Sequence, residues 1–102
     1  MASAMQSENP VYRLFFDEEA GVYSGKSKGY GAIYDSPELA QADVIEAALS
    51  ARRTFDVPLG DLARLALAEN GEGSAVVKKA FSEFSPRLQT WVRNEANRVG
   101  IV

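Results

Sequence analysis

The sequence contains no cysteine and no histidine. A chain without cysteine forms neither a disulfide framework nor a thiolate metal site, and nothing in it requires an oxidising compartment. The lack of histidine removes the commonest general base and the commonest transition-metal ligand. We therefore expect a cytoplasmic protein that is not an enzyme and that holds neither a metal nor a cofactor.

Long apolar runs are also missing. The longest, such as Leu14–Phe16 and Leu65–Ala68, are far shorter than the ~20 apolar residues that span a bilayer, so we expect no membrane segment. Residues 1–10 lack the basic and hydrophobic regions of a secretory signal. We expect them to form a flexible N-terminal tail, in which Met5 is an alternative start.

The composition is that of one small acidic domain. The chain has 102 residues, of which 46% are apolar and 25% charged, as in ordinary globular proteins. We expect a single domain over residues 11–102. The net charge of −3 hides an imbalance, because residues 1–50 carry eight acids and three bases and residues 51–102 carry six acids and eight bases. The acidic first half argues against nucleic acid covering the whole surface.

The first part of the domain has the pattern of short strands. Val11–Phe16 is rich in aromatic and branched residues, and segment 17–21 supplies a polar turn that ends in a glycine. Val22–Ser24 and Tyr30–Tyr34 resume the extended pattern, and the glycine-containing segment 25–29 between them predicts a second turn. Three antiparallel strands are therefore expected here.

The rest of the chain has the pattern of helices. Apolar spacing and capping residues predict helices over 37–53 and 59–69, a third capped by Ser74, and a fourth over 86–99 that Ser85 caps and Gly100 ends. Strands precede helices instead of alternating with them, which favours the α+β class. We expect a small antiparallel three-stranded sheet in the N-terminal half, covered by three to four C-terminal helices.

Two chemically distinct surfaces favour a protein partner. One is the acidic turn, and the other is a face of the last predicted helix where arginine lies beside the single tryptophan, the composition of interface hot spots. The residues are Asp17, Glu18 and Glu19 in the turn, and Arg87, Trp91 and Arg98 in the helix. The alternative explanations are a solvated turn and a tryptophan that packs at the core edge under an arginine.

A second hypothesis is binding of single-stranded nucleic acid by the sheet and by the basic last helix. Aromatic side chains beside lysines stack unpaired bases, and the strand segments contain Tyr23, Lys26, Lys28 and Tyr30. Tyrosines in sheets more often bury their rings against helices, and the sequence has no RNA-binding signature motif. This hypothesis therefore ranks second.

An enzyme ranks last. Residues 20–27 match the nucleotide-binding loop pattern if Ala20 replaces its first glycine. That loop needs a helix directly after it, whereas residues 28–31 contain two glycines and are a poor helix start. We interpret the segment as a hairpin loop.

The sequence thus predicts a non-catalytic protein-binding module, an inhibitor or adaptor that acts on a larger protein or nucleoprotein assembly. Small phage and bacterial proteins of this kind fit the profile. Tyrosine-rich edge strands also invite pairing between chains, so a homodimer through sheet edges remains open at this point. The sequence does not identify the partner.

Overall fold

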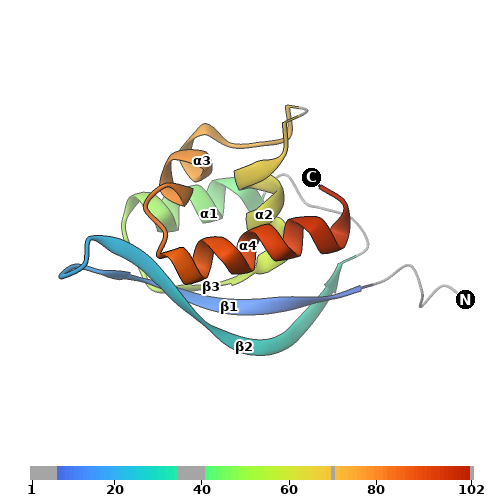
Figure 1. Cartoon of the computed structure of the whole chain (residues 1–102), viewed down its shortest axis with the longest axis horizontal. Helices are drawn as coiled ribbons and strands as arrows, with labels where there is room; N and C mark the ends of the chain where they lie inside the picture. The colour runs from blue at the N-terminus through green and yellow to red at the C-terminus, as the bar shows by residue number, and fades with distance from the viewer. Residues whose placement is uncertain (1–6, 35–40, 70, 102) are drawn as a thin grey trace, which may run out of the picture.

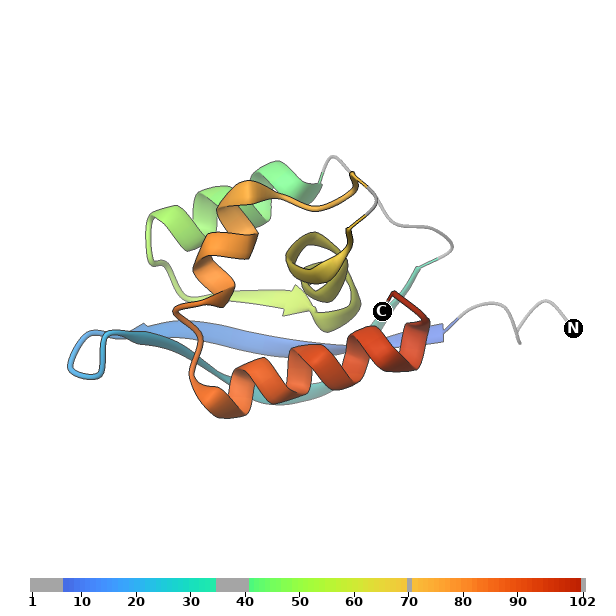
Figure 2. The ribbon, with the colours of Figure 1, turned by 45° about the horizontal axis from the view of Figure 1, so that its top comes forward.

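The structure, a computed structural model, describes residues 7–34, 41–69 and 71–101. The fold is α+β, as predicted: an antiparallel sheet of strand order β2-β1-β3 carries the helices on one of its faces (Figure 1 and Figure 2). The elements in chain order are β1 (Ser7–Asp17), β2 (Val22–Tyr34), α1 (Gln41–Ser50), β3 (Phe55–Pro58), α2 (Leu59–Leu67), α3 (Ala75–Phe81) and α4 (Pro86–Val99).

Side chains of β1 alternate between the covered face and the open face of the sheet, as the two-residue period of a strand requires. Leu14 on the covered face is fully buried, as are Val57 of β3 and Tyr23 of β2 to within a few per cent. On the open face Arg13 meets Asp56 instead, with Nε 2.8 Å from Oδ1. The strand period therefore separates a core face from a charged face.

The second strand is longer than predicted. Segment 25–29, expected to be a turn, belongs to β2 and pairs with β1 through Gly25, Lys26 and Ser27. Gly29 has φ +95° and accommodates an extra residue of β2 beside β1, so the strand bends without reversing. In Figure 1 β2 bows away from the helices. Pairing with a long neighbouring strand thus outweighs the local turn signal.

The third strand is Phe55–Pro58, a segment that the sequence pattern presents as a break between helices. Four residues with a proline carry little strand signal, yet Val57 is buried and the segment pairs with β1 as an edge strand, where proline is tolerated. The first strand begins earlier than expected, because Ser7 already pairs with Tyr34. Part of the predicted tail is therefore strand, and residues 1–6 lie outside the described ranges.

Predicted caps fix two of the helices. The Oγ of Ser74 accepts a hydrogen bond from the N–H of Val77 at 3.2 Å, and the Oγ of Ser85 accepts one from Leu88 at the same distance. Gly100 ends α4 with φ +83°, a left-handed conformation that suits glycine. These local signals are confirmed.

α1 ends at Ser50, before the predicted end near Arg53. Arg52 has φ +55°, and the N–H of Arg53 donates to the carbonyl of Ala48 at 3.0 Å, so the chain leaves the helix through a left-handed residue. The guanidinium of Arg52 lies 4.3 Å from the ring centroid of Phe16, a contact that offsets this backbone conformation. The predicted start of this helix lies outside the described residues.

Tyr23 joins the sheet to the helical layer. Its N–H donates to the carbonyl of Glu83 at 2.9 Å, and its carbonyl accepts from the N–H of Ser85 at 2.8 Å. Its hydroxyl donates to the carbonyl of Leu49 in the last turn of α1, and its ring meets that of Phe84 edge-on. Burial raises the pKa of Tyr23. The sheet, α1 and the α3–α4 turn are thus fastened at one buried point.

Substitutions in α1 test which face of this helix is buried. Leu49 is 2% exposed and Val44 is 65% exposed. Leu49→Ala should lower the free energy of unfolding by about 2–5 kcal/mol, because it leaves a cavity. Val44→Ala should change it by less than about 0.5 kcal/mol. Urea denaturation measures both, and equal losses would contradict the burial of Leu49.

Candidate protein-binding surface

The predicted acidic turn is the tip of the β1–β2 hairpin, which projects from one end of the molecule (Figure 1). Asp17 shapes this turn, because its Oδ1 accepts from the backbone N–H groups of Glu19 at 3.1 Å and Ala20 at 3.2 Å. Glu18 and Glu19 are exposed and form no ion pair with another described residue. The tip therefore offers two free carboxylates, while Asp17 has a structural role.

α4 carries the predicted arginine–tryptophan face. The guanidinium of Arg87 lies 6.0 Å from the ring centroid of Trp91. Arg98 is about 16 Å farther along the helix at 1.5 Å per residue, and its Nε and Nη2 donate to the carboxylate of Glu95 at 2.8 and 2.7 Å. These hydrogen bonds raise the pKa of Arg98. Because Glu95 is only 5% exposed, Arg98 first balances a buried carboxylate, and it is still half-exposed itself.

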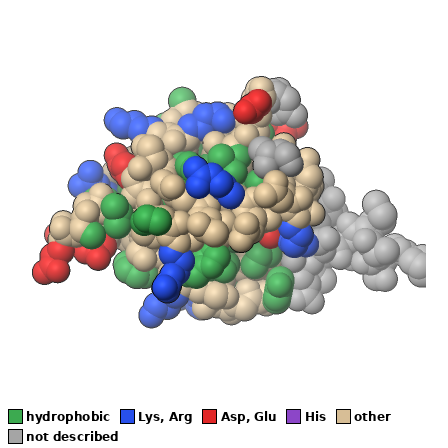
Figure 3. Space-filling view, in the orientation of Figure 1, with side chains coloured by type: hydrophobic (Ala, Val, Ile, Leu, Met, Phe, Trp, Pro, Cys, Tyr) green, Lys and Arg blue, Asp and Glu red, His purple; other side chains and the backbone are tan. Residues whose placement is uncertain are grey.

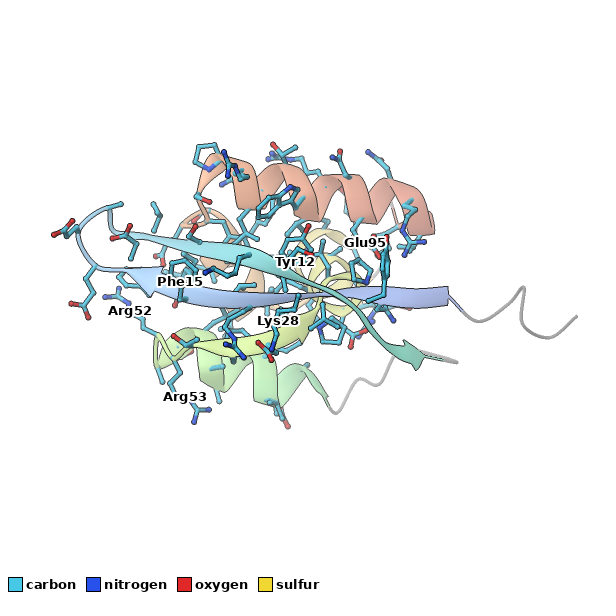
Figure 4. The ribbon with its side chains drawn as sticks, turned by 90° about the horizontal axis from the view of Figure 1, so that it is seen from below. Tyr12, Phe15, Lys28, Arg52, Arg53 and Glu95 are labelled. Carbon is cyan, nitrogen blue, oxygen red and sulfur yellow. The ribbon has the colours of Figure 1, made fainter. Side chains whose placement is uncertain are left out.

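Sequence reasoning missed the residue that positions Trp91. Tyr12 of β1 packs on it with ring centroids 4.9 Å apart and planes at 47°. Burial raises the pKa of Tyr12, and the charges of Tyr30 and Glu95 raise it further. Figure 4 shows Tyr12 and Glu95 where α4 runs beside the sheet. The alternation of side chains along β1 could have indicated this contact, because it places Tyr12 on the covered face of the sheet together with Leu14.

The four residues of the nucleic-acid hypothesis do not form one surface. Tyr23 is buried and cannot stack a base. Tyr30 is 69% exposed and pairs with Pro10, beyond the bulge in β2. Lys26 and Lys28 are exposed on the open face of the sheet. The separation arises because alternate strand residues point to opposite faces and because the bulge at Gly29 shifts this alternation.

Among the described residues no helix covers the open face of the sheet, which is seen in Figure 4. The Nζ of Lys28 lies 3.3 Å from Asp56, whose other carboxylate oxygen binds Arg13. The hydrogen bond from Arg13, aided by that from Lys28, lowers the pKa of Asp56. Lys26 faces Arg13 across the strand pair and has no carboxylate partner in the described part of the chain. The described side chains of this face therefore carry an excess of positive charge.

Two of the hollows in the described part of the chain lie between helices. One of about 580 Å³ lies between the ends of α2 and α4, over Arg64, which pairs with Asp61 at 3.4 Å. The other, of about 330 Å³, lies between α1 and α3. Within the described ranges, neither hollow joins a nucleophile to a general base by a hydrogen bond. No group of His, Cys, Asp or Glu side chains in those ranges could hold a metal ion, and none of the described helices could cross a membrane.

The ion network on the open face predicts a pH dependence. Arg13→Gln should raise the pKa of Asp56 toward the ordinary aspartate value, because Arg13 is the main cause of its depression. A depressed carboxylate pKa stabilises the fold above the unfolded-state pKa, and this contribution is lost as the pH falls through the folded-state pKa. Titration of the Asp56 carboxyl by NMR measures the change. An unaltered pKa would show that Lys28 alone holds this carboxylate.

No family model matches this chain, and no curated protein or solved structure does. A function for this domain therefore has to follow from its own side chains.

Proposed function

We propose that this domain is a non-catalytic protein-binding module, an adaptor or inhibitor, whose partner binds along α4 and β2. The α4–β2 ledge consists of Arg87, Trp91 and Arg98 of α4, Tyr12 of β1 and Tyr30 of β2. The observation that carries the proposal is the setting of Trp91, which is fixed on Tyr12 and partly exposed beside Arg87.

A tryptophan held in this way suits the centre of an interface. Tryptophan, tyrosine and arginine dominate binding hot spots, and a side chain that is already fixed loses little conformational entropy on binding. Tyr30 adds aromatic surface, and its exposed fraction is the largest among the bulky apolar side chains described. The ledge thus combines a preorganised aromatic centre with an accessible aromatic neighbour.

The ends of the ledge are basic. Figure 3 shows hydrophobic side chains along the lower part of this face, below α4, with Lys or Arg side chains on either side of them. Arg87 near the start of α4 has no carboxylate partner among the described residues, and Arg98 near its end is half-exposed although it pairs with Glu95. An apolar centre with a charged rim is the usual anatomy of a protein interface, and a basic rim favours an acidic partner.

Single-stranded nucleic acid is the weaker candidate for this surface. Affinity for a phosphate backbone depends on the number of phosphates that free cations neutralise. Arg98 and Lys28 already pair with carboxylates of the same chain. Arg87 and Lys26 remain without such a partner among the described residues, and two cations are too few for a phosphate track.

The hairpin tip is a separate surface with a different role in the proposal. Glu18 and Glu19 are exposed and project from the body of the domain (Figure 1). Charges in such a position act mainly by long-range attraction, which accelerates association and is screened by salt. We assign to them the steering of a basic region of the partner, whereas the ledge supplies the affinity.

Capture of the partner by the immobilised domain from lysate of its source organism tests this function. Trp91→Ala and Arg87→Glu should each weaken capture of the same protein by about tenfold or more, as expected for hot-spot residues. Quantitative mass spectrometry of the bound proteins measures the loss, and circular dichroism checks that each variant folds.

The matched control is Arg93→Glu. Arg93 also belongs to α4 and lies over an aromatic ring, but that ring is Phe81 of α3, 5.1 Å away, so the substitution changes the same charge outside the ledge. It should leave capture unchanged. The proposal fails if Trp91→Ala and Arg87→Glu retain the partner as well as Arg93→Glu does, or if the captured material is nucleic acid that a nuclease removes.

A further inference from the structure

The free edge of β2 has unpaired backbone groups beside the ledge. Tyr23 directs its N–H and carbonyl away from β1, since both bond to the chain segment of Glu83 and Ser85. In an antiparallel ladder every second residue directs its N–H and carbonyl groups to the same side of the strand. Gly25 and Ser27 therefore direct theirs away from β1, as Tyr23 does. In the described part of the chain no backbone segment pairs with this edge beyond Tyr23.

α4 overhangs this edge. Figure 1 places α4 in the layer above the sheet, and Figure 4, seen from below, shows it projecting beyond β2 on the side away from β1. A strand added to β2 would therefore lie under α4, in the position that a further strand of the sheet would take. Its inward side chains would meet the face of α4 that carries Arg87 and Trp91.

The two sides of the edge differ in chemistry. On the covered side Gly25 has no side chain, and a Cβ added to it would lie 3.4 Å from Leu88 of α4, while Ser27 pairs with Tyr12, on which Trp91 packs. On the open side the exposed residues are Lys26 and Lys28. An added strand would place alternate side chains against an aromatic surface and against lysines.

A second copy of this chain is a poor occupant of the edge. Two β2 strands paired about a two-fold axis near Ser27 would bring Lys26 and Lys28 of one copy against those of the other, and like charges on facing strands oppose pairing. Lysines and bulges on an edge strand are known devices against such self-association. Lys26, which has no carboxylate partner among the described residues, attracts a strand that carries carboxylates.

We propose that the partner contributes an extended segment, with acidic and apolar side chains in alternation, that adds as a strand to β2 at Gly25–Ser27. This inference rests on the protein-binding function proposed above and names the class of partner. The backbone groups of Gly25 and Ser27 supply the hydrogen bonds, Lys26 receives an acidic side chain, and the ledge receives the apolar ones.

A synthetic peptide of alternating glutamate and valine, eight residues long and labelled with fluorescein, is the probe. Fluorescence anisotropy at low salt should show binding to the full-length domain. The control is a peptide of the same composition in two blocks, four glutamates followed by four valines. As a strand it cannot place its glutamates on one face and its valines on the other, so it should bind more weakly by about tenfold or more. Equal binding of the two peptides would overturn the proposal.

Ser27→Pro removes one outward N–H without removing a bond to β1, since proline is tolerated where the strand N–H faces solvent. It should weaken binding of the alternating peptide by about tenfold or more. Ser27→Ala deletes the same hydroxyl, which accepts from the N–H of Gly29 at 3.1 Å, but keeps the N–H. It should bind the peptide as the unchanged protein does.

A peptide methylated on alternate backbone nitrogens gives the same test without altering the protein. Two such peptides are compared. The peptide methylated on the nitrogens that face β2 should not bind, and the peptide methylated on the nitrogens that face away from β2 should bind as the unmethylated peptide does. Equal effects of the two peptides would overturn strand addition even if Ser27→Pro fails to fold.

The outcomes separate this inference from the proposed function. If Ser27→Pro retains the partner captured from lysate while Trp91→Ala loses it, the ledge binds protein but strand addition is wrong. If neither variant loses the partner, the proposed function fails as well. If the domain binds an oligodeoxythymidylate in preference to the alternating peptide, and Lys26→Glu abolishes this while Ser27→Pro does not, the ligand is nucleic acid and both proposals are overturned.

Discussion

The hydrogen bonds of Tyr23 fix the position of the helices against the sheet, and the rest of the structure depends on this constraint. A buried tyrosine needs a partner for its hydroxyl, and the carbonyl at the end of α1 provides it. Its backbone groups point away from β1, and the α3–α4 turn occupies the place of a fourth strand there for the length of one residue. This turn determines where α4 begins, and so it sets the path of α4 along β2. The position of Trp91 over Tyr12 follows from that path.

The parts of the fold that the sequence predicts well are those decided locally. Ser74 and Ser85 cap helices through their own side chains, and Gly100 ends one because only glycine adopts its conformation without strain. The parts that were missed depend on distant pairing. Phe55–Pro58 is a strand because β1 lies beside it, and Gly29 bends β2 instead of turning it because the neighbouring strand continues. No window of a few residues contains that information.

The candidate surface shows the same limit in its side chains. The face of the last helix with Arg87 and Trp91 could be read from helical spacing, and the partner of Arg98 also stands three residues away, at Glu95. What spacing could not reveal is that Glu95 is buried, since this depends on what packs against α4. The same holds for Tyr12, whose contact with Trp91 joins residues far apart in the chain. The lysines and tyrosines of β2 were grouped by proximity in sequence, whereas the strand period and its bulge divide them between two faces.

The bulge at Gly29 also bears on how long a complex would last. It turns the backbone of β2 out of line just beyond Ser27, so a straight added strand runs out of partners after a few residues. An added strand of this length would bury little surface, in the range below about 1,200 Å² that is typical of transient encounters. The affinity of a complex with so small an interface would be limited by fast dissociation more than by slow association. A single domain of this kind would sample its target repeatedly, and lasting occupancy would come from several domains or several target segments held close together.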